Sequence, residues 1–288
     1  MKVVPQVFYK HPEIEKVLVE GLSSVILKSA QTTDTQNERY LAANAFTLVL
    51  NGSLQIENDL GTVTIVPKNH FVFLPKGLYF ITDLIPKNKS FDAIVFFFDE
   101  QLTDEFLTQF ENPDIPKESG HLTIPYSEHL RLFVDTLLAI YRGNQQHQFT
   151  KPKLMELLHL IALTEQGTSF ISQLYAVKNR ERKNIKLFMQ ENFAKPLDIE
   201  DYAYLTGRSI ATFRRDFKSR YGISPKKWLI EKRLEQASQL LQKNSDSIAE
   251  VALQSGYENI PHFIKAFHKK FGMSPKQYQI QHRSSLNI

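Results

Sequence analysis

The stretch from Ile199 to Trp228, IEDYAYLTGRSIATFRRDFKSRYGISPKKW, occurs a second time in altered form from Ile248 to Tyr278, as IAEVALQSGYENIPHFIKAFHKKFGMSPKQY. An alanine and a glycine recur at a spacing of 49 residues, whereas two phenylalanines and a Gly-x-Ser-Pro recur at a spacing of 50. The matched positions are Ala203 and Ala252, Gly207 and Gly256, Phe213 and Phe263, Phe217 and Phe267, Gly222 and Gly272, and Ser224-Pro225 and Ser274-Pro275. An internal repeat of this kind indicates one supersecondary unit that is present twice.

Each repeat has the pattern of a helix-turn-helix. In the first repeat, Asp198 is placed as an N-cap of a short apolar helix, Gly207 forms the turn, and Ser209 caps the next helix. In the second repeat, Ser247 and Asn259 take the two capping positions. A short helix, a turn that contains glycine and a second capped helix is the arrangement found in many DNA-binding proteins.

The second helix of each repeat, about 209–221 and 259–271, has two different faces. With about 3.6 residues per turn, the two phenylalanines fall on a buried side and the polar residues face outward. The outward residues are predicted to contact DNA, and they are Ala211, Thr212, Arg214, Arg215 and Lys218, and then Pro261, His262, Lys265, His268 and Lys269. Arginines can hydrogen-bond base edges, whereas proline donates nothing, so the second helix is predicted to bind mainly phosphates and thymine methyl groups.

The chain is basic only in its C-terminal part. From Lys178 to Ile288 there are 21 Lys and Arg against 11 Asp and Glu, while the first 177 residues hold 14 against 20. A basic module joined to an acidic one indicates a polyanionic partner for the basic module. One such hairpin can be an ordinary structural element, and a basic surface can serve solubility alone. Two copies with matched caps and phenylalanines favour double-stranded DNA as the partner.

The first 99 residues have the pattern of short strands. Apolar segments alternate with Gly and Pro about every ten residues, and they lie at 22–27, 46–50, 53–57, 63–66, 71–74, 78–82 and 91–98. The pair Asn51-Gly52 between two of these segments predicts a β-hairpin with positive φ at both turn residues. A small sandwich or barrel followed by helices places the chain in the α+β class.

Helical periodicity replaces the strand pattern after Asp99. Two longer helices are predicted at 127–142 and 151–165, each with a broad apolar stripe. The stripes can pack entirely within the chain, or they can also hold two copies together. We expect a homodimer through these helices. The following segment, 167–182, contains a short helix and a polar run and is expected to link two domains.

Five aromatic residues of the strand region are candidates for an apolar effector pocket. They are Phe46, Phe73, Tyr79, Phe96 and Phe98. The alternative is that these side chains fill the interior of the barrel, as aromatic residues on strands commonly do. Shifts in melting temperature with a panel of metabolites distinguish the two interpretations.

The sequence lacks the residues of common catalytic and metal sites. It contains no cysteine, and the first 100 residues hold only His11 and His70, with no His-x-His pair for a barrel metal. Neither a Gly-x-Ser-x-Gly nor a phosphate-binding glycine loop occurs. We therefore expect no enzyme activity, no metal and no cofactor.

The longest apolar runs are far shorter than the roughly 20 residues that cross a bilayer. The N-terminus, MKVVPQVFYK, lacks the apolar core of a signal peptide. A cytoplasmic protein without a membrane partner is expected, located at the bacterial nucleoid when it is bound to DNA.

Several motifs of the C-terminal part occur together. They are Phe213-x-Arg215-x-Phe217-Lys218-x-x-x-Gly222-x-Ser224-Pro225, Arg233-Leu234-x-x-Ala237-x-x-Leu240-Leu241, Ile248-Ala249-x-Val251-Ala252-x-x-x-Gly256-Tyr257 and Phe263-x-x-x-Phe267-x-Lys269-x-Phe271-Gly272-x-Ser274-Pro275. This set resembles the DNA-binding domain of AraC/XylS-type bacterial transcriptional regulators. Phe213, Asp216 and Lys265 depart from the family pattern. The resemblance implies base contacts at Ala211, Arg214, Arg215, Pro261 and Lys265, RNA polymerase as a partner, and an activator.

The N-terminal part is similar to the cupin-like sensor domains of the same family. The domains implied are a cupin-like sensor and dimerisation domain at 1–166, a linker at 167–182 and an AraC-type double helix-turn-helix domain at 183–288. A small-molecule effector at the first domain is then expected. The junction also resembles that of type III secretion regulators in the family, in which a partner protein can replace the small molecule.

Overall fold

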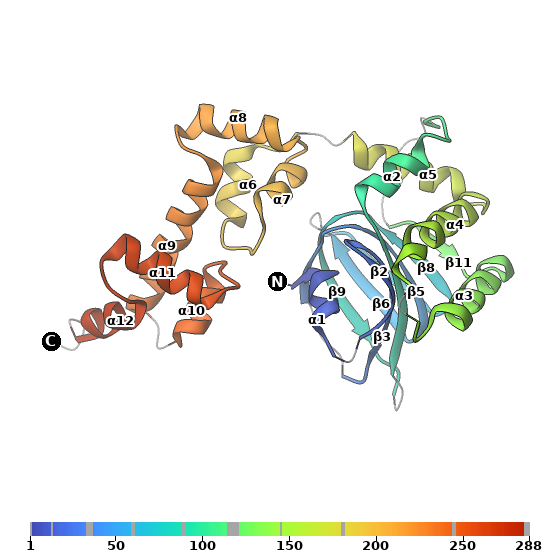
Figure 1. The fold of residues 1–288 in the computed structure, drawn as a ribbon, viewed down its shortest axis with the longest axis horizontal. Helices are drawn as coiled ribbons and strands as arrows, with labels where there is room; N and C mark the ends of the chain where they lie inside the picture. The colour runs from blue at the N-terminus through green and yellow to red at the C-terminus, as the bar shows by residue number, and fades with distance from the viewer. Residues whose placement is uncertain are drawn as a thin grey trace. The chain divides into compact units, whose positions relative to one another are not determined.

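The computed structural model describes residues 2–12, 14–32, 37–58, 61–87, 90–113, 121–144, 146–179, 182–243 and 246–284. Contacts within the chain divide it into an N-terminal unit, Met1–Arg180, and a C-terminal unit, Glu181–Ile288. Strands dominate the first unit and helices make up the second (Figure 1). The predicted α+β class is therefore confirmed.

Two β-sheets form the body of the N-terminal unit. One has the strand order β1-β4-β9-β6-β7, and the other has the order β11-β8-β5-β10-β3-β2. The strands of the first sheet are β1 (Lys2–Val4), β4 (Asn37–Leu41), β9 (Gly77–Leu84), β6 (Ser53–Asn58) and β7 (Val63–Val66). Those of the second are β11 (Thr123–Pro125), β8 (His70–Leu74), β5 (Asn44–Asn51), β10 (Phe91–Phe98), β3 (Ser23–Ala30) and β2 (Glu15–Glu20).

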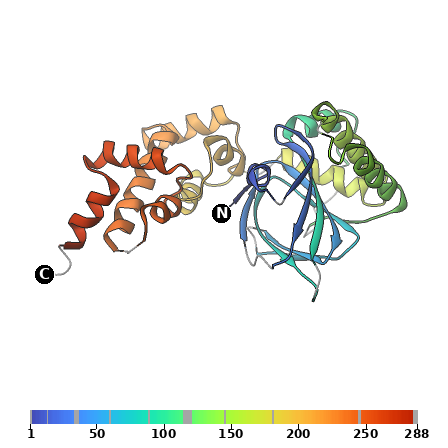
Figure 2. The same ribbon diagram turned by 60° about the horizontal axis from the view of Figure 1, so that its bottom comes forward.

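Most helices of this unit gather on one side of the sheets, as both views of the ribbon show (Figure 1, Figure 2). They are α2 (Glu100–Leu107), α3 (Glu128–Tyr141), α4 (Thr150–Ala162) and α5 (Gly167–Lys178), with a short 3-10 helix at His147–Phe149. A further short helix, α1 (Gln6–Lys10), follows β1. Helix α4 contacts α2, α3 and α5 as well as β2, β3 and β10, so it is the central helix of the layer.

The second sheet is buried on both faces, and this explains its nearly continuous apolar strands. Successive residues of a strand point to opposite faces. In β10, Phe91, Ala93, Val95 and Phe97 belong to the core between the two sheets. Ile94, Phe96 and Phe98 of the same strand belong to the core between the second sheet and the helices.

The predicted hairpin at Asn51-Gly52 was wrong. Strand β5 pairs with β10 and β8, whereas β6 pairs with β7 and β9, so the chain passes from one sheet to the other at this point. Gly52 has the expected positive φ of 81°, but Asn51 does not. The Asn51 side chain instead donates a hydrogen bond to the Ser90 carbonyl oxygen at 2.7 Å. A Cβ at position 52 would lie 2.6 Å from a backbone oxygen, so the crossing requires glycine.

The segment 167–182, expected as a linker, differs from that expectation. Its first twelve residues form α5, and Phe170, Ile171 and Leu174 are buried in the core shared by the helices and the second sheet. Phe170 packs on Phe46 with ring centroids 5.0 Å apart. This burial makes α5 part of the N-terminal unit, and the division between the units falls at Arg180 and Glu181.

The C-terminal unit consists of helices arranged along α9 (Figure 1). Helices α6 (Ile185–Asn192), α7 (Ile199–Leu205) and α8 (Ile210–Tyr221) precede α9 (Pro225–Lys243), and α10 (Ile248–Gln254), α11 (Ile260–Phe271) and α12 (Pro275–Ser284) follow it. The two short helices lie where the repeats predicted them. Trp228 near the start of α9 packs on Phe217 at 5.8 Å, while Leu241 near its end belongs to the core that contains Phe263 and Phe267.

Candidate nucleic-acid interface

Helix α8 is fixed at both ends and along one face. The Ser209 hydroxyl accepts a hydrogen bond from the Thr212 backbone N–H at 3.3 Å, as the capping pattern predicts. Gly222 ends the helix in the left-handed conformation with φ 71°. Phe213 and Phe217 are fully buried, with ring centroids 5.8 Å apart. Because the caps and the two buried phenylalanines fix α8, the opposite face of the helix is turned toward solvent.

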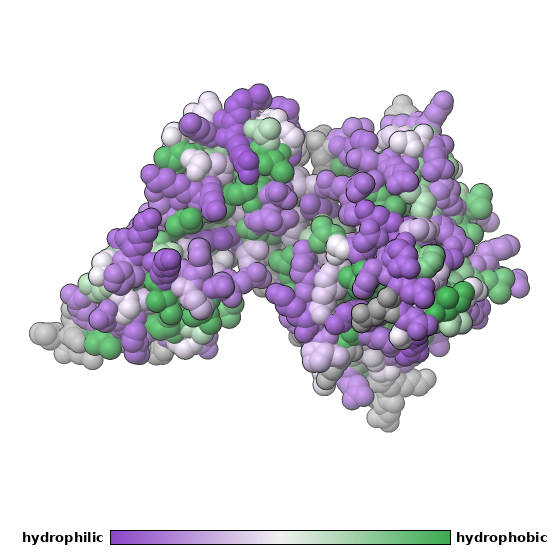
Figure 3. All heavy atoms as spheres, viewed as in Figure 1, coloured by the Kyte–Doolittle hydropathy of each residue, from purple (hydrophilic) through white to green (hydrophobic). Residues whose placement is uncertain are grey.

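The residues predicted to contact DNA lie on that opposite face of α8. The exposed residues are Ala211, Arg214, Arg215 and Lys218. Thr212 is half-buried, and its hydroxyl accepts a hydrogen bond from the Ser209 hydroxyl at 2.9 Å. Figure 3 shows hydrophilic side chains over α8 in the C-terminal unit. The face is cationic and carries two arginines that can bond base edges or phosphates.

Helix α11 repeats this construction with a different outward face. The Asn259 side chain accepts from the His262 N–H at 2.8 Å, and Gly272 ends the helix with φ 76°. All five predicted residues of this helix are exposed, namely Pro261, His262, Lys265, His268 and Lys269. Ile264, also exposed, stands where α8 has Arg214. The outward face of α11 thus combines cations with apolar contact groups and carries no arginine.

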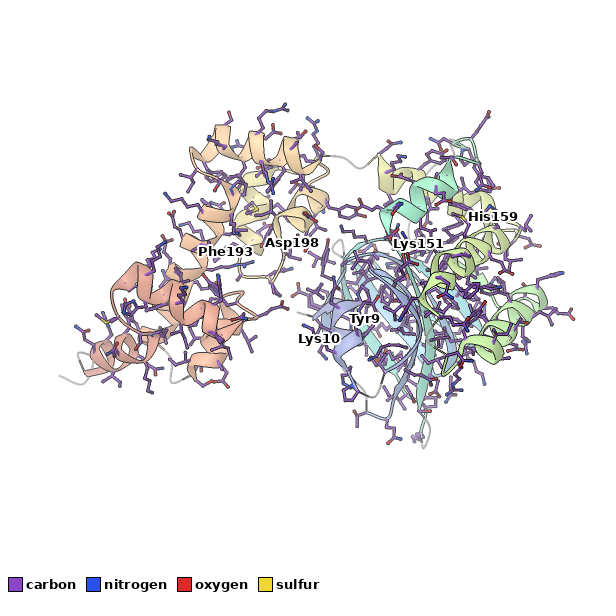
Figure 4. All side chains as sticks on the ribbon, viewed as in Figure 1. Tyr9, Lys10, Lys151, His159, Phe193 and Asp198 are labelled. Carbon is purple, nitrogen blue, oxygen red and sulfur yellow. The ribbon has the colours of Figure 1, made fainter. Side chains whose placement is uncertain are left out.

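The side chain of Arg233 holds α9 against the connection between α6 and α7. Its guanidinium donates to the backbone oxygens of Phe193 at 2.8 Å, Lys195 at 2.6 Å and Leu197 at 3.2 Å. These carbonyls belong to the end of α6 and the connection to α7, and Phe193 lies beside α9 (Figure 4). A charged donor that satisfies three carbonyls holds this connection in one position.

The second repeat reaches the same place through Gly256. A Cβ on this residue, whose φ is 84°, would lie 2.7 Å from the Ala194 backbone oxygen and 2.9 Å from Nε of Arg233. The turn of the second helix-turn-helix therefore packs directly on the α6–α7 connection, which immediately precedes the first repeat. This contact determines how the two outward helices are placed relative to each other within the C-terminal unit.

Two buried phenols support the same region. Tyr202 of α7 donates to the Asn192 backbone oxygen at 2.8 Å. Burial raises the pKa of Tyr202 to about 12, although the nearby Arg233 guanidinium acts in the opposite direction. Burial also raises the pKa of Tyr257, again against the effect of Arg233. Both phenols therefore stay protonated at neutral pH and serve as neutral structural groups.

The sequence-based reasoning missed the contacts of two polar residues next to α8. Arg208, in the turn before the helix, lies with its Nε 3.2 Å from Oδ2 of Asp216. In the sequence, Asp216 stands out only as a departure from the family pattern, and no motif marks Arg208 as its partner. A partner eight residues away across a turn is not evident from helical spacing.

The five aromatic residues proposed for an effector pocket do not line one cavity. Phe46, Phe73, Phe96 and Phe98 are fully buried between the second sheet and the helices, whereas Tyr79 belongs to the core between the sheets. Strand alternation is the reason, because the even-numbered positions of β5 and β10 face the helix layer.

A small cavity does lie between the sheets, and none of the five aromatic residues lines it. Its volume is about 30 Å³, and its lining is mostly apolar. Three charged residues line it, namely Lys28, Arg39 and Asp83. Lys28 and Arg39 both pair with the buried carboxylate of Asp83. The charges at this cavity therefore already satisfy one another to a large extent.

Among the described residues, no cluster of three or more His, Asp or Glu side chains is arranged to hold a metal ion. In the same part of the chain, no helix combines the length and the apolar character needed to span a bilayer.

Residues 44–173 match the family described as the ExsA N-terminal regulatory domain, and residues 202–281 match a helix-turn-helix domain. The virulence regulon transcriptional activator VirF of Yersinia enterocolitica is 34% identical over 148 residues, which are 51% of this chain and 55% of VirF. The HTH-type transcriptional regulator ExsA of Pseudomonas aeruginosa is 32% identical over 125 residues, which are 43% of this chain and 45% of ExsA. The chain thus spans about half the length of the curated relatives that it matches.

Among solved structures, apo ToxT from Vibrio cholerae aligns with 91% of this chain and 98% of its own, at 10% identity and a TM-score of 0.48.

The doubled helix-turn-helix and the regulatory domain before it make the chain similar to transcriptional regulators of the AraC/XylS family. Within that family its N-terminal domain is of the ExsA type. This match confirms the narrower resemblance to the type III secretion regulators.

Proposed function

We propose that this protein is a transcriptional activator that binds a specific sequence of double-stranded DNA through α8 and α11. The observation that carries the proposal is the matched construction of the two helices. Each is capped, anchored by two buried phenylalanines and ended by a left-handed glycine, and each presents a cationic face to solvent. Helices held in this way can enter successive major-groove segments about 34 Å apart on one side of a duplex.

Within this proposal the two helices have unequal roles. Arg214 and Arg215 of α8 are suited to guanine edges, because arginine donates two parallel hydrogen bonds to O6 and N7. The outward residues of α11 include Pro261 and Ile264, which can contact thymine methyl groups, and lysines that neutralise phosphates. The half-site under α8 is therefore expected to be the stricter of the two.

The test is selection of binding sites from a random pool of duplexes with the full chain. We expect a two-part site with the two parts about one helical turn apart. Arg215→Ala should weaken the selected site by about 1–3 kcal/mol and relax one position of it. Lys269→Ala should weaken all duplexes alike and reduce the slope of affinity against salt concentration by about one. If Arg215→Ala binds the selected site as tightly as the unchanged chain, the role assigned to α8 is wrong.

A homodimer through α3 is part of the proposed function. Leu132 is 60% exposed and Ile140 is 50% exposed, and eight residues apart on a helix they share one side. The apolar stripe of α4 is instead used within the chain, since Leu154, Leu157, Leu158 and Ile161 are all buried. The dimer contact that we propose is thus narrower than the two helices expected from the sequence.

Sedimentation velocity tests the dimer. The double change Leu132→Glu and Ile140→Glu should give monomers, because like charges would meet across a two-fold contact. The matched control is Arg131→Glu, which changes the net charge by the same two units at an exposed position of α3 that is nine residues, and therefore half a turn, away from Ile140. Equal sedimentation of all three proteins as dimers would remove α3 from the interface.

For regulation, we propose a protein partner rather than a small molecule at the N-terminal unit. The cavity between the two sheets, with about 30 Å³, has room for roughly one or two water molecules, so this cavity is too small for an effector that fills the usual ligand pocket of about 300–1,000 Å³. RNA polymerase is the further partner that an activator requires. A chromosomal target would place the protein on the nucleoid of a bacterial cytoplasm. Ligand-induced melting shifts across a metabolite panel test this, and a reproducible shift would argue against protein control.

A further inference from the structure

The turn before α8 contains Arg208, whose guanidinium makes three hydrogen bonds. Nη1 of Arg208 donates to the backbone oxygens of Thr206 at 2.7 Å and Lys183 at 2.9 Å. Its Nε donates to Oδ2 of Asp216 at 3.2 Å, and only 12% of its side chain is exposed. Arg208 therefore fixes the position of the Asp216 carboxylate relative to the backbone of the turn.

The second oxygen of that carboxylate faces the arginine that we assign to base contact. Oδ1 of Asp216 lies 3.6 Å from Nε of Arg215, whose side chain is 77% exposed. One carboxylate is thus shared between a buried arginine that cannot move freely and an exposed arginine that can. The result is a relay that runs from the turn through Asp216 to Arg215.

The second repeat has no such relay. The positions equivalent to Arg208 and Asp216 are Tyr257 and Ala266. Tyr257 is buried against Phe263 with ring centroids 5.2 Å apart, so an aromatic contact fills the place of the ion pair. The ion pair is consequently not needed to build a helix-turn-helix of this kind, and its presence beside α8 calls for another explanation.

The relay affects base recognition in two ways. A free arginine side chain has many rotamers, and a carboxylate beside Nε restricts it to those that point its terminal nitrogens away from the helix. The same negative charge lies near the phosphates of any bound duplex and weakens binding to all sequences. A duplex that offers Arg215 the correct base recovers affinity, and other duplexes do not.

We propose that Asp216, held by Arg208, is a positioning residue that makes the contact of Arg215 selective for guanine. This inference rests on the proposed function, because it assumes that α8 enters the major groove. It assigns a role in specificity to an acidic residue on a helix whose other outward charges are cationic. It also predicts which of the two repeats contains the base-selective contact.

The test compares three full-length proteins, namely the unchanged chain, Asp216→Asn and Glu258→Gln. Glu258 is an exposed acid in the corresponding turn of the second repeat, so its change removes the same charge near DNA without touching the relay. Each protein is used for selection from a random duplex pool, and affinities for the selected site and for an unrelated duplex are then measured. Emission of Trp228, the single tryptophan, reports whether the C-terminal unit is folded.

Asp216→Asn is expected to bind the unrelated duplex more tightly and to lose roughly fivefold or more of its preference for guanine at one position of the site. Glu258→Gln is expected to bind all duplexes slightly more tightly with the same preference. If Asp216→Asn does not fold, Asp216→Glu serves instead, because it keeps the charge, moves the carboxylate by one methylene and should also reduce the preference.

The outcomes separate this inference from the proposed function. If the unchanged chain selects a site and the Asp216 variant keeps the same guanine preference, the relay has no role in specificity. If the unchanged chain selects no site at all, both the proposed function and the inference are overturned. A loss of preference that Glu258→Gln shares would show a general charge effect and would also overturn the role assigned to Asp216.

Discussion

The contact between Gly256 and the α6–α7 connection can be tested with two alanine substitutions. Gly222 and Gly256 both have positive φ, at 71° and 84°. An alanine in this conformation costs about 1–2 kcal/mol at either position. No heavy atom lies within 4 Å of a Cβ at Gly222, so Gly222→Ala should cost that amount and no more.

At Gly256 the new methyl group meets the backbone oxygen of Ala194 and the guanidinium of Arg233. Either neighbour must move, and movement endangers the three hydrogen bonds that Arg233 donates to backbone carbonyls. Loss of one bond to a charged group costs about 1.5–3 kcal/mol. Gly256→Ala should therefore lower the free energy of unfolding of the C-terminal unit by about 3–5 kcal/mol in total.

Urea unfolding followed by tryptophan fluorescence measures this unit alone. Trp228 is the single tryptophan of the chain and packs on Phe217 and Tyr221 in the C-terminal unit. With a slope of about 1–2 kcal/mol per molar urea, the extra cost of about 1.5–3 kcal/mol at Gly256 should separate the two midpoints by about 0.75–3 M. Equal midpoints for Gly222→Ala and Gly256→Ala would show that the two repeats do not pack on each other in the way described.

Three further changes test other parts of the fold. Asn44→Ala removes a buried amide that donates to the Thr103 hydroxyl at 3.0 Å, and it should cost about 2–3 kcal/mol in thermal unfolding followed by circular dichroism. Ser247→Ala removes an N-cap and should cost about 1 kcal/mol in urea unfolding, with Ser238→Ala as a surface control. The hydrogen bond from Lys232 holds the pKa of Glu235 below its usual value. The pair therefore stabilises the fold when the pH is above the usual carboxyl pKa, and this stabilisation is lost as the pH falls through the lowered pKa of Glu235. Stability of Glu235→Gln should accordingly change less between neutral and acid pH than stability of the unchanged chain.

Most of the C-terminal unit could be predicted from the sequence because its signals are local. Caps, left-handed glycines and the spacing of two phenylalanines lie within a few residues of the helices that they define, and the repeat supplies each signal twice. The ties between the helices could not be predicted in this way. Arg233 reaches carbonyls 36 to 40 residues earlier in the chain, and no periodicity connects such positions.

In the N-terminal unit seven strands could be predicted, but β1, β2, β4 and β11 were missed and the pairing of the strands could not be predicted. Asn51-Gly52 is a hairpin signal only if the strands on both sides stay in one sheet, and here they separate into two. The five candidate pocket residues fall into two cores for a related reason. Phe96 and Phe98 face the helices whereas Tyr79 faces the other sheet, and the sequence does not show which face of a strand meets the helices. Burial of one sheet on both sides removes the polar alternation that would have shown the two faces.

The differences between the repeats indicate how one fold could hold the two unequal DNA contacts that we propose. Each outward helix has an equivalent pair of buried phenylalanines and an equivalent glycine at its end, so these features do not distinguish α8 from α11. The distinction lies in how each is braced. Beside α8, the half-buried pair of Arg208 and Asp216 places charge next to an exposed arginine. Beside α11, Lys270 donates to the Glu231 backbone oxygen at 3.0 Å and lies 3.5 Å from a carboxylate oxygen of Glu235, which ties that helix to α9.

Bracing of the first kind orients a base-reading group, whereas bracing of the second kind fixes the helix itself and leaves its lysines free to follow phosphates. A helix whose outward groups contact mainly phosphates tolerates many sequences, because phosphates carry no base information. We therefore expect changes to Arg208 or Asp216 to alter which sequences are bound, and changes to Lys270 to alter how tightly every sequence is bound. Swapping Arg208 and Asp216 together for the tyrosine and alanine of the second repeat removes one charge of each sign, so the affinity for unrelated DNA should stay nearly unchanged while the selected site loses its strict half.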